Sequence, residues 1–325
     1  MDSNAWPIHT RPWRLGRPCP AKRQTENGSR MVAGSDLFIE RITGTIGAVV
    51  SGPDLRRPLP ERTVAALRQA ILDHGVIFLR GQDIDMDRYW AFMARFGLPM
   101  KEESTGTEHD SAADVMTGDL SITRHATAVW HADTTSLARP PLATALRAVQ
   151  VPPFGGDTCW SSMTAAWEAL TPPMQAMLDG LTAVHSVAPT IERMREFGAR
   201  FEAAYTARNA REQNHPVVIT HPETGRKALY VNESFVTRIV ELSARESAAV
   251  LSFLFRHVER PDFTMRWKWA PHDLAFWDNR AVQHFAVPDY TGTRLMQRIV
   301  LAGAVPGKPS RLTGEWGVAQ VEQAQ

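Results

Sequence analysis

The chain has few cysteines, no long apolar run and almost no net charge. Only Cys19 and Cys159 occur among 325 residues, which is too few for a disulfide framework and suits a reducing cytoplasm. No Cys-x-x-Cys pair is present to indicate a zinc finger. Because no run of about 18 apolar residues exists, no membrane span is expected. A formal net charge of +1 gives no electrostatic reason to expect nucleic acid as a partner.

Two phosphate-binding signatures are also missing. Neither G-x-G-x-x-G nor G-x-x-x-x-G-K-[ST] occurs, which disfavours dinucleotide and nucleoside-triphosphate binding. The apolar content of 43% and charged content of 22% are ordinary for a soluble globular protein. A chain of this length can bury a substantial core.

The composition divides the chain into three parts. Residues 1–33 are expected to form a basic, disordered extension, residues 34–310 a single folded domain and residues 311–325 a tail. The first thirty residues contain only two acids, against the basic residues Arg11, Arg14, Arg17, Lys22, Arg23 and Arg30. No apolar segment follows them, so a secretory signal is not indicated. Because the folded pattern begins near Met31, translation starting there is a hypothesis that intact-mass measurement would test.

Short β-like runs and amphipathic helices alternate along the folded part. Strands are expected at 38–42, 46–50, 76–79, 142–149, 265–269, 274–277 and 296–302, with a hairpin formed by 217–220 and 227–231. Helices are expected at 59–74, from Asp85 to Phe96, at 163–170, at 172–178 and from a capping box at Ser243 to about 257. Residues 100–124 are expected to form a long loop. This order favours a mainly β (α+β) protein, a double-stranded β-helix (jelly roll) with inserted helices.

The tripeptide His131-Ala132-Asp133 is the most informative motif. In an extended segment, residues i and i+2 point the same way, so His131 and Asp133 could hold one metal ion. The third ligand must come from elsewhere, and His284 lies in a segment that has the pattern of a strand end. Two imidazoles and one carboxylate can occupy one face of an octahedral ferrous ion, which leaves positions for a chelating co-substrate and dioxygen.

Four ordered motifs extend this pattern. They are Trp130-His131-Ala132-Asp133-Thr134, Gly155-Gly156-Asp157-Thr158, Trp277-Asp278-Asn279-Arg280 followed by His284, and Arg294 to Arg298. With these motifs, the chain from about Ile42 to about Pro306 resembles the taurine / 2,4-dichlorophenoxyacetate dioxygenase family. Members of that family are iron(II)- and 2-oxoglutarate-dependent oxygenases.

The resemblance implies a role for each matching residue. His131, Asp133 and His284 match the iron ligands of the family. Thr158 and Arg294 match the groups that bind the distal carboxylate of 2-oxoglutarate. Arg298 matches a second arginine, near the 2-oxo-acid end of the co-substrate and the anionic group of the substrate.

The chemistry of these side chains agrees with such roles. A guanidinium binds a carboxylate through two parallel hydrogen bonds, and a hydroxyl can use a remaining lone pair. In a strand, the spacing of Arg294 and Arg298 keeps both side chains on one face. Asp278 and Arg280 are expected to brace the turn that orients His284. Because related halogenases lack the carboxylate ligand, Asp133 favours hydroxylation.

The implied activity is a dioxygenase reaction. Fe(II) is the expected cofactor, and 2-oxoglutarate and O2 are the co-substrates, so that succinate and CO2 accompany hydroxylation of a small anionic organic molecule. Arg298 favours an anionic substrate, and the resemblance implies a sulfonate, a sulfate ester, an aryloxyalkanoate or a similar anion. The residues after Phe96-Gly97 depart from the taurine-type pattern, and Thr127 stands where that pattern has asparagine, so taurine itself is disfavoured. Thr127, Phe235, His109 and Arg298 are the candidate substrate contacts, and Lys101 and Arg124 are further candidate anion contacts.

Several alternatives stay open at this point. One is a biosynthetic hydroxylase that acts on a natural-product or amino-acid-like substrate. A non-catalytic metal-binding jelly roll would retain the three ligands but would not need Arg294 or Thr158. A zinc hydrolase could use the same ligands, although H-E-x-x-H is absent. By resemblance the protein is expected to be a dimer or tetramer, and the apolar residues of 265–269 suit either an interface or the core.

Overall fold

The structure is a computed structural model, and it describes residues 29–31, 37–99, 116–119, 128–196 and 212–308. Predicted residues His109, Thr127, Lys101 and Arg124 lie outside these ranges. In the described helices, no segment is long and apolar enough to cross a membrane.

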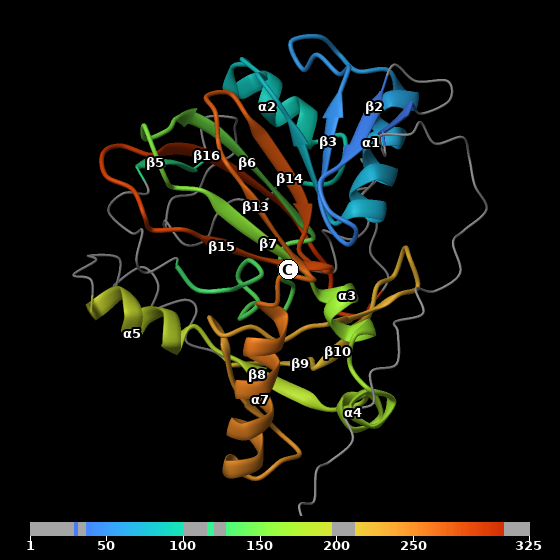
Figure 1. Cartoon of the computed structure of the whole chain (residues 1–325), viewed down its shortest axis with the longest axis vertical. Coiled ribbons are helices and arrows are strands. Elements are labelled where there is room, and N and C mark those ends of the chain that lie inside the picture. The colour runs from blue at the N-terminus through green and yellow to red at the C-terminus, as the bar shows by residue number, and fades with distance from the viewer. Residues whose placement is uncertain (1–28, 32–36, 100–115, 120–127, 197–211, 309–325) are drawn as a thin grey trace, which may run out of the picture.

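Two antiparallel-rich sheets form the body of the protein (Figure 1). The larger sheet has the strand order β1-β2-β3-β4-β14-β6-β16-β5. These strands span Ser29–Met31, Phe38–Arg41, Ala48–Ser51, Val76–Leu79, Leu274–Asp278, Ala143–Gln150, Leu295–Leu301 and Met116–Asp119, in that order. The smaller sheet has the order β13-β7-β15, with β13 at Thr264–Trp267, β7 at Thr158–Ser162 and β15 at Val282–Ala286.

Large apolar side chains fill the space between these two sheets. Phe78 and Trp277 from the larger sheet pack with Trp160, Trp267 and Val282 from the smaller one. The rings of Phe78 and Trp267 stack with centroids 3.9 Å apart. Burial of such rings strongly stabilises a sheet-on-sheet core. The site described below lies beside this core.

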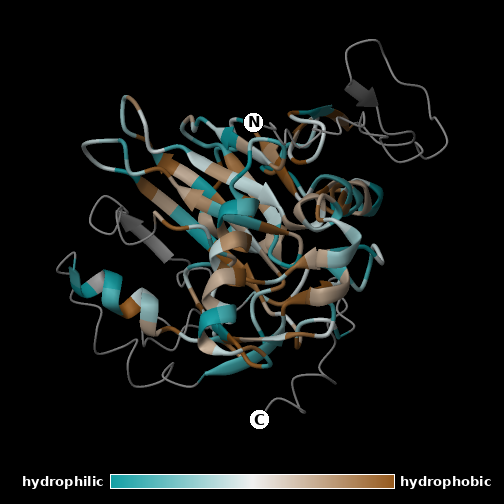
Figure 2. Cartoon of the chain, turned by 60° about the horizontal axis from the view of Figure 1, so that its bottom comes forward, coloured by the Kyte–Doolittle hydropathy of each residue, from teal (hydrophilic) through white to brown (hydrophobic). Residues whose placement is uncertain are grey.

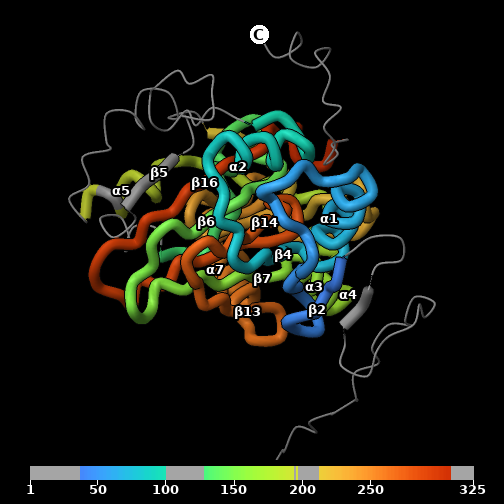
Figure 3. Tube along the Cα trace, turned by 90° about the horizontal axis from the view of Figure 1, so that it is seen from above, coloured from blue at the N-terminus to red at the C-terminus, as the bar shows by residue number. Residues whose placement is uncertain are grey.

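Helices cover the outer face of the larger sheet. Helix α1 (Glu61–His74) contacts β4 and β14, and α2 (Met86–Met93) contacts β16 (Figure 3). Val64, Leu67 and Ile71 form the buried stripe of α1 that packs there. This stripe has the i, i+3, i+7 spacing of one helix face. The Asp85 side chain caps α2 by accepting from the Arg88 N–H, as expected from the sequence.

The remaining described elements are helices and short strands, and a second apolar cluster lies among most of them (Figure 2). The helices are α3 (Met163–Glu168), α4 (Pro172–Leu178), α5 (Ala188–Glu196) and α7 (Ala244–Val258). The strands are β8 (Thr182–His185), β9 (Gln213–Pro216), β10 (Val218–Thr220), β11 (Lys227–Leu229) and β12 (Val236–Ile239). Strands β10 and β11 pair as the expected hairpin. Ser243 and Glu246 form the expected capping box of α7.

Several elements differ from the sequence prediction. Strands β5, β7, β8, β9 and β12 and helix α5 were not predicted, because their apolar patterns are short or broken by polar residues. Strand β5 lies within residues 100–124, which were expected to form a loop, and it pairs with β16. His284 lies in the middle of β15 rather than at a strand end. Ser29–Met31, within the expected N-terminal extension, pairs with β2. The apolar side chains of 265–269 are buried in the inter-sheet core, so they offer no exposed apolar face for an interface.

Candidate metal centre and co-substrate site

His131 and His284 are neighbours through backbone pairing. The His131 N–H donates to the His284 carbonyl (3.0 Å), and the His284 N–H donates to the His131 carbonyl (2.8 Å). This isolated antiparallel bridge brings the two imidazole centroids to 4.1 Å. Because Asp133 is two residues from His131, its side chain turns to the same side. Residues far apart in the sequence therefore meet at the edge of β15.

The three side chains are close enough to share one cation. A ligand atom from each of His131, Asp133 and His284 lies within 4.8 Å of the other two. His131 Nδ1 lies 2.7 Å from the Val129 carbonyl, which can only accept, so Nδ1 carries the proton and Nε2 keeps a lone pair. His284 Nε2 faces Asp133 Oδ1 at 4.0 Å.

The electrostatics keep the two imidazoles neutral and the carboxylate charged. Burial lowers the pKa of His131, and burial together with the charge of His131 lowers the pKa of His284 to about 3. Burial alone would raise the pKa of Asp133. Its interactions with His284 and with the guanidinium of Arg298 outweigh burial, and the pKa of Asp133 is lowered to about 2. Two neutral nitrogen donors and one anionic oxygen suit a divalent transition metal, so the residues fit the metal that the sequence predicts.

Thr144 and Asn279 hold the Asp133 carboxylate in place, although neither was predicted as a site residue. The Thr144 hydroxyl donates to Asp133 Oδ2 (2.6 Å), and Asn279 Nδ2 donates to the Thr144 oxygen (2.8 Å). Asn279 Oδ1 accepts from Trp277 Nε1 (2.9 Å). The motif that contains Asn279 was a signal for it, whereas Thr144 is an ordinary strand threonine that only the pairing of β6 with β14 brings beside Asp133.

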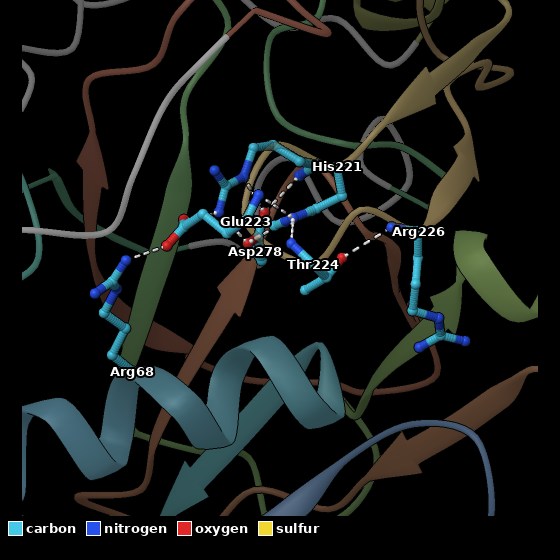
Figure 4. A network of polar contacts seen from close by, with 7 residues as sticks. Arg68, His221, Glu223, Thr224, Arg226 and Asp278 are labelled. Atoms are coloured by element: carbon cyan, nitrogen blue, oxygen red, sulfur yellow. Dashed lines mark hydrogen bonds and ion pairs between the residues drawn. The ribbon is translucent and has the colours of Figure 1, made fainter. Parts of the chain in front are cut away.

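A buried ionic network braces the turn between β14 and β15 (Figure 4). Arg280 Nη2 lies 2.6 Å from Asp278 and 2.8 Å from Glu223. Arg68 on α1 also pairs with Glu223, and His221 Nε2 lies 3.0 Å from Asp278 Oδ2. Burial would raise the pKa of Asp278, but Arg280 and His221 hold it well below its usual range. The bracing role expected for Asp278 and Arg280 agrees with these contacts.

Thr158, at the start of β7, and Arg294, just before β16, contact each other. Arg294 Nη2 donates to the Thr158 hydroxyl (3.3 Å), and its Nε donates to the Gly156 carbonyl (3.0 Å). Trp269 Nε1 also donates to Thr158 (3.0 Å), a contact that no motif in the sequence indicated. Arg294 is 2% exposed, and this burial lowers its pKa. A deeply buried guanidinium beside a hydroxyl is a suitable seat for a carboxylate.

Two glycines allow this arrangement. Gly155 and Gly156 both have positive φ, near +66° and +67°. A Cβ on Gly155 would lie 2.4 Å from the Asp289 carbonyl oxygen. The Gly156 N–H donates to Asp289 Oδ1 (2.9 Å), which fastens the Gly-Gly-Asp-Thr turn to the segment before Arg294. The motif therefore sets the position of Thr158 by close backbone approach.

Arg298 lies on β16 and pairs with the metal-site carboxylate. Its Nη1 is 3.1 Å from Asp133 Oδ1. Phe235 is buried, and its N–H donates to Asn232 Oδ1 (3.0 Å), while Asn232 Nδ2 donates to the Thr135 hydroxyl (3.0 Å). This places the Phe235 turn next to the segment that carries Asp133. The structure thus brings together the three predicted ligands with Arg298, and Thr158 with Arg294.

Facing sheets with two histidines and a carboxylate at their edge define a metal-dependent oxygenase of the double-stranded β-helix class. Residues 39–300 match the family described as "Taurine catabolism dioxygenase TauD, TfdA family". The chain belongs to this family and is a 2-oxoglutarate-dependent dioxygenase.

Individual relatives cover most of the chain. A sulfate ester dioxygenase of Pseudomonas putida, described as alpha-ketoglutarate-dependent, is 36% identical over 295 residues, which are 86% of this chain and 95% of the relative. The crystal structure of a taurine dioxygenase from Burkholderia xenovorans has a TM-score of 0.71 and 34% identity, covering 88% of this chain and 99% of that chain. The crystal structure of AAD-2 in complex with Mn(II) and N-oxalylglycine has a TM-score of 0.71 and 28% identity. The match covers 84% of this chain and 99% of the AAD-2 chain.

Proposed function

We propose that the protein binds Fe(II) through His131, Asp133 and His284 and binds 2-oxoglutarate through Arg294 and Thr158. The observation that carries this proposal is the pairing of a neutral two-histidine, one-carboxylate centre with a buried arginine–hydroxyl seat. The related AAD-2 structure contains Mn(II) and N-oxalylglycine, a diacid with the same 2-oxo-acid end as 2-oxoglutarate, which supports a divalent metal and a diacid together in this fold.

Bound Fe(II) supplies chelation of the 2-oxo acid and activation of dioxygen for hydroxylation of the substrate. The protein supplies placement. Thr144 and Asn279 orient the Asp133 carboxylate, and the backbone bridge aligns His131 with His284. Arg294 neutralises the distal carboxylate of the co-substrate. The Thr158 hydroxyl, which accepts from Arg294, can donate its own proton to the same carboxylate. Succinate and CO2 are the expected co-products.

We propose a small organic anion as the primary substrate, in the class of sulfate esters, sulfonates and aryloxyalkanoates. Arg298 adds positive charge next to Asp133, so an anion is electrostatically favoured near the centre. The P. putida relative is named for sulfate esters, which supports beginning with that class. Hydroxylation of the carbon bonded to the ester oxygen would release sulfate and leave an aldehyde.

The test is succinate formation by purified enzyme with Fe(II), 2-oxoglutarate and O2, screened across alkyl sulfates, sulfonates and aryloxy acids. We expect substrate-stimulated succinate that disappears in His131→Ala and Asp133→Ala. Arg294→Lys should raise the KM for 2-oxoglutarate by about tenfold or more, because lysine cannot make the two-pronged contact. Turnover sustained by Zn(II) without O2 would instead identify a hydrolase and refute the proposal.

Two further predictions concern the protein in solution. By the family resemblance we expect a homodimer or homotetramer, which light scattering on purified protein would measure. A cytoplasmic location is expected from the low cysteine content, and cell fractionation would test it.

A further inference from the structure

Arg193 on α5 reaches the turn that precedes Phe235. Its Nη2 lies 2.7 Å from the Ser234 hydroxyl, 3.3 Å from the Ser234 carbonyl and 3.3 Å from the Thr190 hydroxyl. The Thr190 hydroxyl also donates to the Ser234 carbonyl (3.0 Å). All three partners of Arg193 are neutral. The contacts therefore fix the guanidinium in place without compensating its charge.

No carboxylate pairs with Arg193 in the part of the chain that the structure describes. Its Nε is buried and has no hydrogen-bond partner there. Glu233 and Glu196 raise its pKa only from a longer distance, and burial lowers it. Leaving a half-buried charge unpaired is costly. A cation in the last turn of a helix is stabilised by the helix dipole. That effect does not explain the burial of Arg193, because Arg195 lies in the same turn and is exposed.

The guanidinium lies near the proposed metal centre. Ser234 belongs to the turn that Asn232 ties to Thr135, two residues after Asp133. Figures 1 and 3 show α5 at the edge of the molecule. Arg193 thus connects a peripheral helix to the Ser234 turn.

The second nearby cation, Arg298, has a different environment. Its Nη1 is 3.1 Å from Asp133 Oδ1, so an anionic partner already balances part of its charge. The hydrogen bonds of Arg193 all come from Nη2. Its Nε and Nη1 donors have no acceptor among the described residues. An oxyanion with several acceptor oxygens would satisfy the Nη1 donors and the charge, while the buried Nε stays out of its reach.

We propose that Arg193, together with the Ser234 hydroxyl, binds the anionic end group of the primary substrate. This inference rests on the proposed function and refines it, because it names Arg193 on α5 as the cation that binds the anionic group of the substrate. The ligand is an organic oxyanion such as a sulfate ester, a sulfonate or a carboxylate. A cationic substrate is disfavoured by the charge of Arg193.

The first experiment measures anion binding without turnover. Inorganic sulfate is titrated calorimetrically into anaerobic enzyme loaded with Fe(II) and saturating 2-oxoglutarate, so that the Arg294 seat is filled. Arg193→Gln should weaken sulfate binding by about tenfold to a hundredfold, as expected for loss of charged hydrogen bonds. Arg195→Gln, with the same charge change on the same helix, should stay within about twofold. Arg193→Lys should lie between wild type and Arg193→Gln.

The second experiment measures kinetics with hexyl sulfate, hexanesulfonate and hexanoate against neutral 1-hexanol. Arg193→Gln should raise the KM for any active anionic probe by about tenfold or more, while the KM for the co-substrate stays near the wild-type value. If no probe stimulates succinate formation, the sulfate titration alone tests whether Arg193 binds the anion. Circular dichroism and Tm of each variant establish that it is folded.

The outcomes separate the two proposals. Equal sulfate affinity in wild type and Arg193→Gln, or no sulfate binding by wild type, overturns the assignment of Arg193. Wild-type enzyme that fails to bind 2-oxoglutarate refutes the proposed function instead. Arg193→Gln that loses 2-oxoglutarate binding along with sulfate would also reject a specific role for Arg193 in substrate binding.

Discussion

The hydroxyl of Thr144 donates a 2.6 Å hydrogen bond to Oδ2 of Asp133 and accepts from Asn279. This contact fixes the orientation of the carboxylate, with Oδ1 directed toward His284. Groups that orient a metal ligand in this way commonly contribute strongly to metal affinity. Thr144 therefore links the core of the larger sheet to the metal centre.

Replacing Thr144 by valine should weaken metal binding by about tenfold to a hundredfold. Valine has nearly the same shape, but it leaves Asp133 Oδ2 and Asn279 Nδ2 without their shared partner. Competition between the protein and a chelator for Mn(II) would measure the change. Thr144→Ser keeps the hydroxyl and should stay close to wild type. Unchanged affinity in the valine variant would mean that the carboxylate is oriented by other contacts.

The buried network around Arg280 should make a large contribution to folding stability. Arg280→Gln leaves Asp278 and Glu223 buried with one partner fewer, so we expect a loss of about 3–5 kcal/mol in the free energy of unfolding. Arg226→Gln is a matched control from the same region (Figure 4), because its pair with Glu168 is half-exposed. That variant should lose no more than about 1 kcal/mol. Urea unfolding of both variants would distinguish a structural network from a surface one.

Much of the fold followed from local patterns in the sequence. The buried stripe of α1, the alternation in β13 and the capping box at Ser243 each specify an element through its own residues. β7 was missed because its residues, from Thr158 to Ser162, include three polar side chains that are nevertheless buried. Their burial depends on pairing with β13 and β15. Such long-range pairing leaves little trace in a short window of sequence.

The site was predictable to the extent that its residues sit in motifs. His131, Asp133 and His284 were identified before the structure brought their ligand atoms together. Thr144 and Arg193 could not be found in this way, because nothing adjacent to either one indicates a site. Only β-strand pairing places Thr144 beside Asp133. Likewise, only the packing of α5 against the Ser234 turn leaves Arg193 half-buried with no carboxylate partner among the described residues.

The Gly-Gly turn gives a prediction about both stability and co-substrate binding. In Gly155→Ala the new Cβ would meet the Asp289 carbonyl at 2.4 Å at a positive φ, so the turn must move. We expect a loss of about 2 kcal/mol or more in unfolding free energy, with a raised KM for 2-oxoglutarate because Thr158 shifts. Gly44→Ala is the control, since its Cβ would have no neighbour within 4 Å. Similar Tm values for the two variants would contradict the close-approach argument.

The fully buried His185 should make stability depend on pH. Its Nδ1 lies 2.9 Å from the Thr135 hydroxyl. Burial and the nearby charge of His215 lower the pKa of His185 to about 3, below the value of about 6.5 expected in the unfolded chain. Between these pH values the unfolded state binds the extra proton. The contribution of His185 to the free energy of unfolding is therefore fully present above about pH 6.5. It decreases as the pH falls toward 3, by up to about 1.4 kcal/mol per pH unit.

His185→Asn removes the titrating group while keeping a polar side chain beside Thr135. The free energy of unfolding of metal-free wild type should therefore fall more steeply from pH 7 to pH 5 than that of the variant. The other buried histidines are common to both proteins, so the difference between the two curves isolates His185. Urea titrations at several pH values would measure it. A difference that stays constant across this range would show that the unfolded and folded chains protonate His185 alike, and that its burial does not hold it neutral.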